Sequence, residues 1–279
     1  MNRHFILSAT IEKPELNDPA WAGSVLKAAE QAGLDLAVLG APDSLPFDAM
    51  VIAAWAAPMT ERIGLVPCIS TAVAHPFHAA RSLSAIDFLS SGRAAWNPVT
   101  GADHSNSVTE DMIAAARSLW DGWASDALII DKKSGRYLDS SKVRLSNYEG
   151  PHFKVRGPLN AARPLQGHPL LVCDSSSSFD AVGTDLVIID EGQVVIGETN
   201  CLRRVGSNAD IAALISEFEA GDIAGVHWSI DDPEQDIAAI DAFASAVSAL
   251  RQAGQPGATL RERLCLPLSD NLISEGAFA

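Results

Sequence analysis

The stretch Arg81-Ser-Leu-Ser-Ala-Ile-Asp-Phe-Leu-Ser-Ser-Gly-Arg-Ala-Ala-Trp-Asn-Pro-Val-Thr100 joins the end of a helical pattern to a short apolar run. Its apolar residues recur at helical spacing as far as Leu89, and Gly92 is typical of the position just beyond a helix. The run Arg93–Trp96 that follows is short and apolar, as expected of a buried strand. A helix leading directly into such a strand is the repeat that builds parallel α/β sheets.

The same alternation extends over the whole first half of the chain. Gly33 follows one helical segment, and Asp48 is placed to cap the next. A later segment, Thr109–Trp123, has apolar residues at helical spacing and begins with a residue type that caps helices. This pattern predicts successive βα units. The expected strands are Phe5–Ser8, Leu36–Leu39, Ile63–Ile69 and Arg93–Trp96, and the expected helices between them are Ala20–Ala32, Asp48–Met59 and Phe77–Leu89.

The pattern is irregular in the second half. Residues 131–168 are rich in Gly, Pro, Ser and basic side chains and too long for an ordinary connection, so we expect an inserted excursion packed over one end of the sheet. The run Leu186–Asp190 is followed at once by Glu191-Gly192 and the run Gln193–Ile196, which favours an antiparallel hairpin without a crossover helix. The remaining expected elements are strand Pro169–Cys173, helix Asn208–Ala220, strand Gly225–Ser229 and helix Pro233–Ala253.

Composition narrows the classes of function. The 279 residues suit a single α/β barrel domain over 1–279, because such barrels commonly have about 250 residues. Lys and Arg number 20 against 35 Asp and Glu, and this net charge of −15 disfavours nucleic acid and anionic membranes as partners. The four cysteines are scattered, so neither a metal site nor a disulfide framework is expected. Without a recognisable signal peptide or a spanning run of about 20 apolar residues, we expect a cytoplasmic protein.

Polar residues follow several of the expected strands, and in a parallel barrel these strand ends form the active site. Ser70, Thr71 and His75 come after the third strand, and Asn97 and Thr100 come at the end of the fourth. Each has a structural alternative. Asn97 before Pro98 is also typical of a turn, and a lone His such as His75 often caps or packs. The serine run 175–178 after the fifth strand is also consistent with a flexible loop.

The segment Arg81–Thr100 resembles the corresponding segment of the bacterial-luciferase-like flavin monooxygenases that act on nitrilotriacetate, dibenzothiophene sulfone, pristinamycin precursors and long-chain alkanes. Further matching segments occur in the same order along the chain. They are Met59–Gly64, Leu119–Trp123, Asp131–Arg136, Gly150–Leu159 and Thr259–Leu264. The resemblance implies a (β/α)8 TIM-type barrel, here abbreviated around strands 5–7, where relatives are considerably longer.

The resemblance also implies a chemistry. Relatives use FMN as FMNH2, supplied by a separate flavin reductase, and O2 to oxygenate a small organic substrate. The cofactor carries such chemistry, and the protein supplies position and polarity. The family pattern assigns cofactor contacts to Ser70, Thr71, Asn97 and Thr100, and to the phosphate-loop pair Ser176 and Ser177. His75 and Asn97 are the candidate catalytic residues.

Departures from the family pattern leave alternatives open. Asp174-Ser175 replaces the family's Ala-Gly, which sets a carboxylate near the expected phosphate, so flavin binding is expected to be weak or lost. The leading hypothesis is an active two-component monooxygenase. The second is a non-catalytic member that binds flavin weakly, or another ligand, as a store, sensor or partner subunit. The third is a structural interaction protein with a blocked barrel mouth.

A homodimer is also expected. The helical segment Asp48–Met59 is apolar on nearly every face, more than a helix covering one side of a barrel needs. We therefore expect the second and third helices to pair with a second copy.

Overall fold

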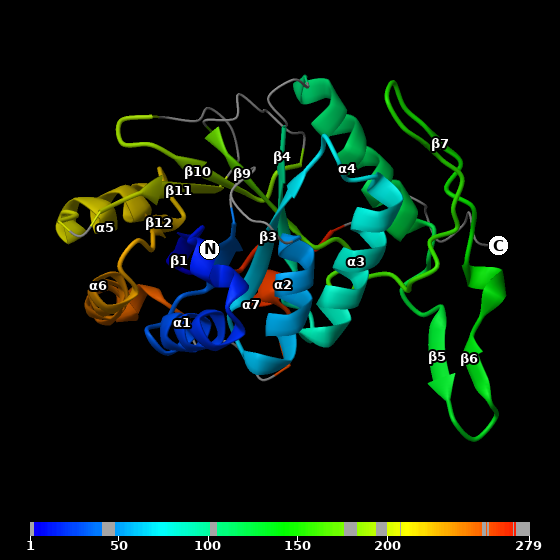
Figure 1. The fold of residues 1–279 in the computed structure, drawn as a ribbon, viewed down its shortest axis with the longest axis horizontal. Helices are drawn as coiled ribbons and strands as arrows, with labels where there is room; N and C mark the ends of the chain where they lie inside the picture. Colours follow the sequence, from blue (N-terminus) through cyan, green and yellow to red (C-terminus); the bar gives the residue numbers. More distant parts are fainter. Residues whose placement is uncertain are drawn as a thin grey trace.

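The computed structural model describes residues 3–40, 48–100, 105–175, 183–193, 200–206, 208–252, 255, 257–269 and 271. Eight parallel strands form a closed barrel in the order β1-β12-β11-β10-β9-β4-β3-β2 (Figure 1). This confirms the expected fold. The barrel strands are β1 Ile6–Ile11, β2 Leu36–Leu39, β3 Gly64–Ser70, β4 Ala95–Val99, β9 Leu170–Asp174, β10 Leu186–Ile189, β11 Asn200–Arg204 and β12 Gly225–Ser229.

Helices cover the outer face of the first four strands. They are α1 Pro19–Gln31, α2 Ala49–Ala56, which continues as the 3-10 helix Ala57–Met59, α3 Pro76–Leu89 and α4 Asn106–Asp121. Asp48 caps α2 as expected, because its side chain accepts a hydrogen bond from the Met50 amide. Helix α4 begins earlier than expected, with Ser105 at the N-cap. Thr109 is therefore a buried residue inside α4 rather than its cap.

The second half of the barrel is abbreviated. Only ten residues separate β10 from β11, and only eleven separate β9 from β10. The expected hairpin is wrong, because β9 and β11 occupy both edges of β10 in parallel register. The strand expected at Gln193–Ile196 lies largely outside the described residues. Helices α5 Ile211–Ala220 and α6 Pro233–Ala246 flank β12, and α6 is followed by the 3-10 helix Ser248–Leu250.

Alternation along the strands divides the core into two layers. Side chains such as Leu36, Val66 and Leu186 point inward and fill the barrel. Their strand neighbours, such as Leu7 and Leu65, point outward and pack under helices α1 and α2. Because apolar side chains fill the amino-end half of the barrel, polar inward positions remain only near the carboxyl ends of the strands.

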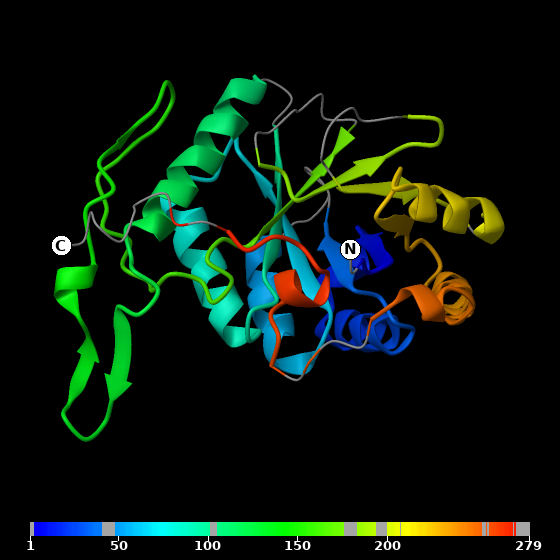
Figure 2. The same ribbon diagram turned by 180° about the vertical axis from the view of Figure 1, so that it is seen from behind.

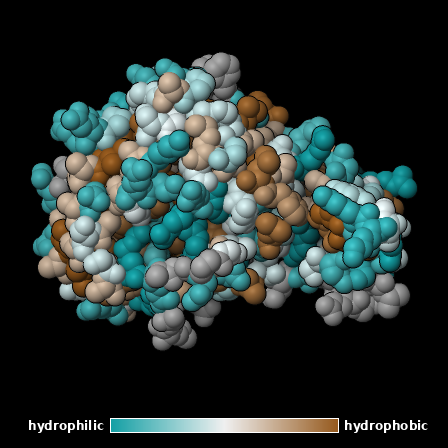
Figure 3. Space-filling model, turned by 90° about the horizontal axis from the view of Figure 1, so that it is seen from below, coloured by the Kyte–Doolittle hydropathy of each residue, from teal (hydrophilic) through white to brown (hydrophobic). Residues whose placement is uncertain are grey.

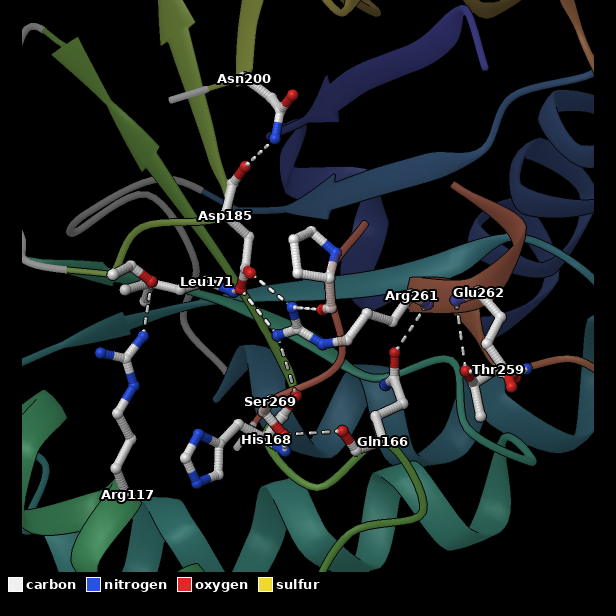
Figure 4. A network of polar contacts seen from close by, with 12 residues as sticks. Arg117, Gln166, His168, Leu171, Asp185, Asn200, Thr259, Arg261, Glu262 and Ser269 are labelled. Atoms are coloured by element: carbon white, nitrogen blue, oxygen red, sulfur yellow. Dashed lines mark hydrogen bonds and ion pairs between the residues drawn. The ribbon is translucent and has the colours of Figure 1, made fainter. Parts of the chain in front are cut away.

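The segment 259–269 closes the amino end of the barrel. It contains the short helix α7, Leu260–Arg263, in the red part of the chain (Figure 2). Leu260 and Leu264 lie among the inward apolar residues. Arg261 pairs bidentately with Asp185 at 2.5 and 2.9 Å and also donates to the His168 carbonyl (Figure 4). Two apolar side chains and this buried ion pair fix the bottom of the barrel, so ligands must enter from the opposite, carboxyl end.

The inserted excursion forms an arm, which we define as residues 128–156. It contains β5 Leu128–Asp131, β6 Arg136–Leu138, the 3-10 helix Ser140–Lys142, β7 Tyr148–Glu149 and β8 Lys154–Val155. The expectation that it covers one end of the barrel is wrong, because β7 and β8 lie along α4 at the side and the β5–β6 hairpin projects beyond them (Figure 1). Asp111 of α4 holds it by accepting the His152 and Phe153 amides at 2.7 Å and the Tyr148 hydroxyl.

Helix length and hydropathy decide whether a helix could span a membrane. Within the part of the chain that the structure describes, no helix is both long enough and apolar enough to cross a bilayer.

Candidate active site at the barrel mouth

The polar mouth of the barrel is built from inward side chains near the carboxyl ends of several strands. Strand β1 supplies Ser8 and Thr10, β3 supplies Cys68 and Ser70, and β4 supplies Asn97. Strands β9, β11 and β12 supply Asp174, Arg204 and His227. Register explains why they meet, since Cys68 lies beside Asn97 and Arg204 lies beside His227, which lies beside Ser8.

Asn97 is one inward residue that the sequence singled out. Only 6% of it is exposed, and its amide nitrogen lies 3.6 Å from the Cys68 sulfur. The Cys68 thiol in turn lies 3.1 Å from the Gly40 carbonyl oxygen. Burial raises the pKa of Cys68 to about 12, so the thiol stays protonated and is not a nucleophile. Asn97 and Cys68 therefore form a neutral wall at the mouth.

Three threonine hydroxyls join the loops after β3 and β4 to α4. Thr109 Oγ1 lies 3.0 Å from Thr71 Oγ1 and 2.9 Å from Thr100 Oγ1. The Thr71 amide also donates to the Val99 carbonyl oxygen at 3.0 Å. Thr71 is buried, so its hydroxyl holds the two strand ends and the helix together.

His227 lies fully buried in the wall shared by β12 and β1. Its Nδ1 is 3.0 Å from Ser8 Oγ, and its Nε2 is 2.8 Å from Thr10 Oγ1. Burial, with the positive charge of Arg204 adding to it, lowers the pKa of His227 to about 3. The imidazole is therefore neutral near pH 7, with one nitrogen donating to a hydroxyl and the other accepting from one.

Arg204 joins the rim of three strands. Its Nη2 lies 2.5 Å from Asp174 Oδ2, and its Nε lies 2.9 Å from Asp190 Oδ1. The carboxylate of Asp174 thus has a guanidinium beside it, which sequence reasoning did not anticipate. Burial alone would lower the pKa of Arg204, but the two aspartates more than offset this and raise it. One cation and two carboxylates leave the rim with a negative excess.

The other expected site residues are dispersed. Ser70 ends β3 with partial exposure, facing inward. His75 caps α3, because its Nδ1 accepts from the Phe77 amide at 3.2 Å, which agrees with the structural alternative. It lines a separate hollow of about 400 Å³ beside α4, together with Thr71, His152 and Phe153. Ser176 and Ser177 lie outside the described residues.

Sequence reasoning missed Arg204, His227 and Thr109 at the mouth. Arg204 lies in a strand whose polar sequence, Asn200–Arg204, gave no apolar signal. His227 lies inside the expected strand Gly225–Ser229, where an inward polar residue near the carboxyl end was a usable signal. Thr109 was noted only as a helix cap.

The described side chains suit a neutral, polar ligand face better than a metal. Among them, no group of three or more His, Cys, Asp or Glu is positioned to hold a metal ion. The amide of Asn97 and the hydroxyl of Ser70 offer hydrogen bonds to a planar heterocycle such as the flavin ring, while the carboxylates at the Arg204 rim oppose an anionic group. The mouth therefore carries neutral hydrogen-bonding groups on its β3 and β4 side and an excess of carboxylate at the Arg204 rim.

Comparison with known proteins shows which family and which relatives this chain is similar to. Residues 4–178 match the family model of the luciferase-like monooxygenases. The chain is 34% identical over 179 residues to the N-acetyl-S-(2-succino)cysteine monooxygenase of Bacillus subtilis, covering 54% of this chain and 40% of that protein. It is 34% identical over 170 residues to one subunit of the pristinamycin IIA synthase of Streptomyces pristinaespiralis, covering 60% of this chain and 61% of that protein. The chain thus spans less than two thirds of each of these relatives.

The barrel also resembles solved structures. The structure of a riboflavin lyase with modified FMN and riboflavin superposes with a TM-score of 0.77 at 19% identity, covering 95% of this chain and 96% of the other. At this identity the likeness concerns the fold.

Proposed function

Because the chain belongs to the luciferase-like monooxygenase family, we propose that it is a monooxygenase that uses FMNH2 and O2 to oxygenate a small organic substrate. A separate flavin reductase would supply the FMNH2. The observation that carries the proposal is the family match through β1 to β9, the strands that supply Asn97 and Ser70 to the mouth.

Within this proposal, the flavin ring lies against the neutral wall of the mouth. Reduced flavin, when bound, supplies the electrons that activate O2. Asn97 and Ser70 hydrogen-bond the edge of the ring, and Thr71 and Thr100 act through Thr109 by fixing the loops that frame it. His75 contributes by capping α3 next to this frame. Neutral His227, buried in the wall shared by β12 and β1, holds the Ser8 and Thr10 hydroxyls of β1 in place and carries no charge near pH 7.

Binding of the flavin phosphate is the least favourable part of the proposed site. Ser176 and Ser177 follow β9 and are proposed to contact the phosphate, as the family pattern implies. Asp174 and Asp190 hold the nearby Arg204, so an incoming phosphate meets two carboxylates around one guanidinium. Flavin binding is therefore proposed to be weak.

A second candidate function has a specific observation in its favour. One similar protein is named as a subunit of pristinamycin IIA synthase. Together with the abbreviated β9–β11 region, this favours a partner subunit that assembles with a longer family member. In this case the chain alone would not react with flavin and oxygen.

Rapid mixing of anaerobic protein and FMNH2 with oxygenated buffer separates the two candidates. The monooxygenase predicts a phase of flavin reoxidation whose amplitude grows with protein concentration and disappears in Asn97→Ala. Asn160→Ala, an exposed residue outside the mouth, is the matched control. Reoxidation identical to that of free FMNH2 would contradict the monooxygenase and favour the partner subunit.

The homodimer expected through α2 and α3 depends on how much apolar surface these helices expose. Four of the apolar side chains of α2, namely Ala49, Ile52, Ala53 and Ala56, are buried in the chain's own core. Val51 remains 64% exposed, and Leu89 at the end of α3 is also exposed. The apolar surface available for pairing on these two helices is therefore smaller than the sequence indicated.

A further inference from the structure

A hollow of about 400 Å³ lies beside the barrel mouth. Its walls come from the loop after β3, the first turn of α4 and the turn between β7 and β8 of the arm. This volume is within the range of about 300–1,000 Å³ that is typical of small-molecule sites. Thr71 lines the hollow and directly follows Ser70, which faces into the mouth. A ligand in the hollow therefore lies next to the proposed position of the flavin ring.

The arm contributes a fixed wall to this hollow. Asp111 Oδ2 accepts the His152 and Phe153 amides at 2.7 Å, and the imidazole Nε2 of His152 lies 2.9 Å from Ser107 Oγ. These contacts join the upper end of the arm, β7 and β8, to the start of α4 (Figure 1). Seen from below, the arm projects from the body as a lobe (Figure 3). Its turn between β7 and β8 is therefore held against α4, although much of the arm stands away from the body.

The hollow combines a hydrogen-bond donor with apolar walls. Because Nδ1 of His75 accepts from the Phe77 amide at 3.2 Å, the imidazole hydrogen is on Nε2. Among the described residues, this Nε2–H has no hydrogen-bond partner, so it is available to a ligand. The ring of Phe153 meets that of His75 edge to face, with centroids 6.0 Å apart, and Val73 and Val108 also line the hollow. A small ligand with an apolar body and a hydrogen-bond-accepting group suits these walls.

The charges around the mouth favour an anion at this hollow. Among the described residues that line it, none is Asp or Glu. The arm, which supplies one wall, has seven Lys and Arg against three Asp and Glu, whereas the whole chain has 20 against 35. Strand β11, whose Arg204 pairs with two carboxylates, is opposite β3 in the eight-strand barrel. An anionic ligand is therefore attracted on the arm side of the mouth and repelled at the Arg204 rim.

We propose that the hollow binds the carboxylate of a small organic anion that also has an apolar body. The His75 Nε2–H donates to the carboxylate, the imidazole of His152 adds a polar contact from the arm, and Phe153 packs against the apolar body. Naming this anion the substrate rests on the proposed function, whereas its binding requires no flavin. The turn between β7 and β8 thereby contributes to the choice of substrate.

Ligand-observed NMR titration of the full-length protein without flavin tests this site with phenylacetate and its neutral analogue phenylacetamide. We expect wild type to bind phenylacetate about tenfold more tightly than phenylacetamide, because hydrogen bonds to a charged acceptor are stronger. His75→Asn keeps a side chain that caps helices but lacks the imidazole Nε2–H, so it should weaken phenylacetate binding by about tenfold. Lys133→Ala, which removes an exposed charge at the β5–β6 turn of the arm, is the matched control and should leave binding unchanged.

His152→Ala is a second variant that keeps the arm in place, because Asp111 accepts the backbone amide of this residue. It should weaken phenylacetate binding by about threefold, as expected for loss of one partly exposed polar contact. Circular dichroism confirms that each variant is folded.

Absence of phenylacetate binding by wild type, equal affinities for phenylacetate and phenylacetamide, or wild-type affinity in either histidine variant would each overturn the proposal. Because binding is measured without flavin, the site and the proposed reaction can fail separately. Phenylacetate binding as expected, with flavin reoxidation identical to that of free FMNH2, would support the anion site and contradict the monooxygenase.

Discussion

The two halves of the barrel are stabilised by different kinds of contact. Around β1 to β4, each strand is followed by a helix that buries its outer face. Around β9 to β11, the two connections are ten and eleven residues long, and charged pairs reach across the rim. The first half is held by apolar burial, and the second is held in part by partly exposed ion pairs.

Two arginines show this difference at the level of single side chains. Arg93, before β4, is 4% exposed and donates to five oxygens, which belong to Ala57, Thr60, Ile63 and Ser90. The side chain of Arg204, at the end of β11, is 33% exposed and pairs with two carboxylates. Buried hydrogen bonds are costly to leave unmade, whereas exposed ion pairs contribute about 0–1 kcal/mol. Arg93 and Arg204 are therefore expected to contribute unequally to the stability of the protein.

The largest expected effect comes from removing these two guanidinium groups in matched variants. Arg93→Met should lower the free energy of unfolding by about 3 kcal/mol or more, because it leaves several buried carbonyl oxygens without donors. Arg204→Met should lower it by less than about 1 kcal/mol. Urea denaturation of both variants measures the difference. Equal losses would mean that the two halves do not differ in the way described.

A pH-dependent effect, smaller within any one pH unit, is expected at the seam between the halves, where β12 meets β1. In the folded protein His227 takes up a proton only near pH 3, whereas an unfolded His does so near about 6.5. The unfolded state therefore binds more protons as the pH falls below about 6.5. Stability should decrease toward pH 3 by up to about 1.4 kcal/mol for each pH unit.

Comparison with His227→Gln isolates this contribution, since other buried groups titrate equally in both proteins. The variant is expected to be less stable at pH 7.5, where it perturbs the contacts with Ser8 and Thr10, yet to lose less stability between pH 6 and pH 4.5. Urea midpoints across this range provide the measurement. Parallel pH profiles would show that His227 is not held neutral by its burial.

The contrast between the halves also explains where sequence reasoning succeeded. Strands β2, β3 and β4 lie close to their expected positions because continuous apolar runs bounded by Gly are a strong local signal. Strand β11 was missed because Asn200, Arg203 and Arg204 make its sequence polar. The hairpin was predicted from a genuine turn at Gly192, which has φ 78°. The turn carries no information about which strands flank β10.

The site residues also differ in whether the sequence could predict them. Asn97 and Ser70 were predictable because each directly follows or ends a well-marked apolar run of the first half, although Asn97 lies within β4. The contact of Arg204 with Asp174, or of His227 with Ser8, depends on the register between strands distant in sequence. Such pairings follow from barrel closure, which no local pattern specifies. The position of the arm along α4 depends likewise on Asp111, a single residue in an otherwise ordinary helix.

Equilibrium titration with FMN, comparing wild type with Asp174→Ala, tests the central claim that the mouth is a flavin site weakened by its own rim. Removing the carboxylate relieves a like-charge interaction of about 1 kcal/mol at 4 Å in water, and more in a partly desolvated cleft. It also releases Arg204 from its 2.5 Å contact, so the guanidinium becomes available to the phosphate.

Asp241→Ala, an exposed carboxylate on α6, is the control. We predict weak wild-type binding that improves with added salt, and at least tenfold tighter binding by Asp174→Ala, about 1.4 kcal/mol. Equal affinities, a weaker variant, or no binding by either protein would contradict the account.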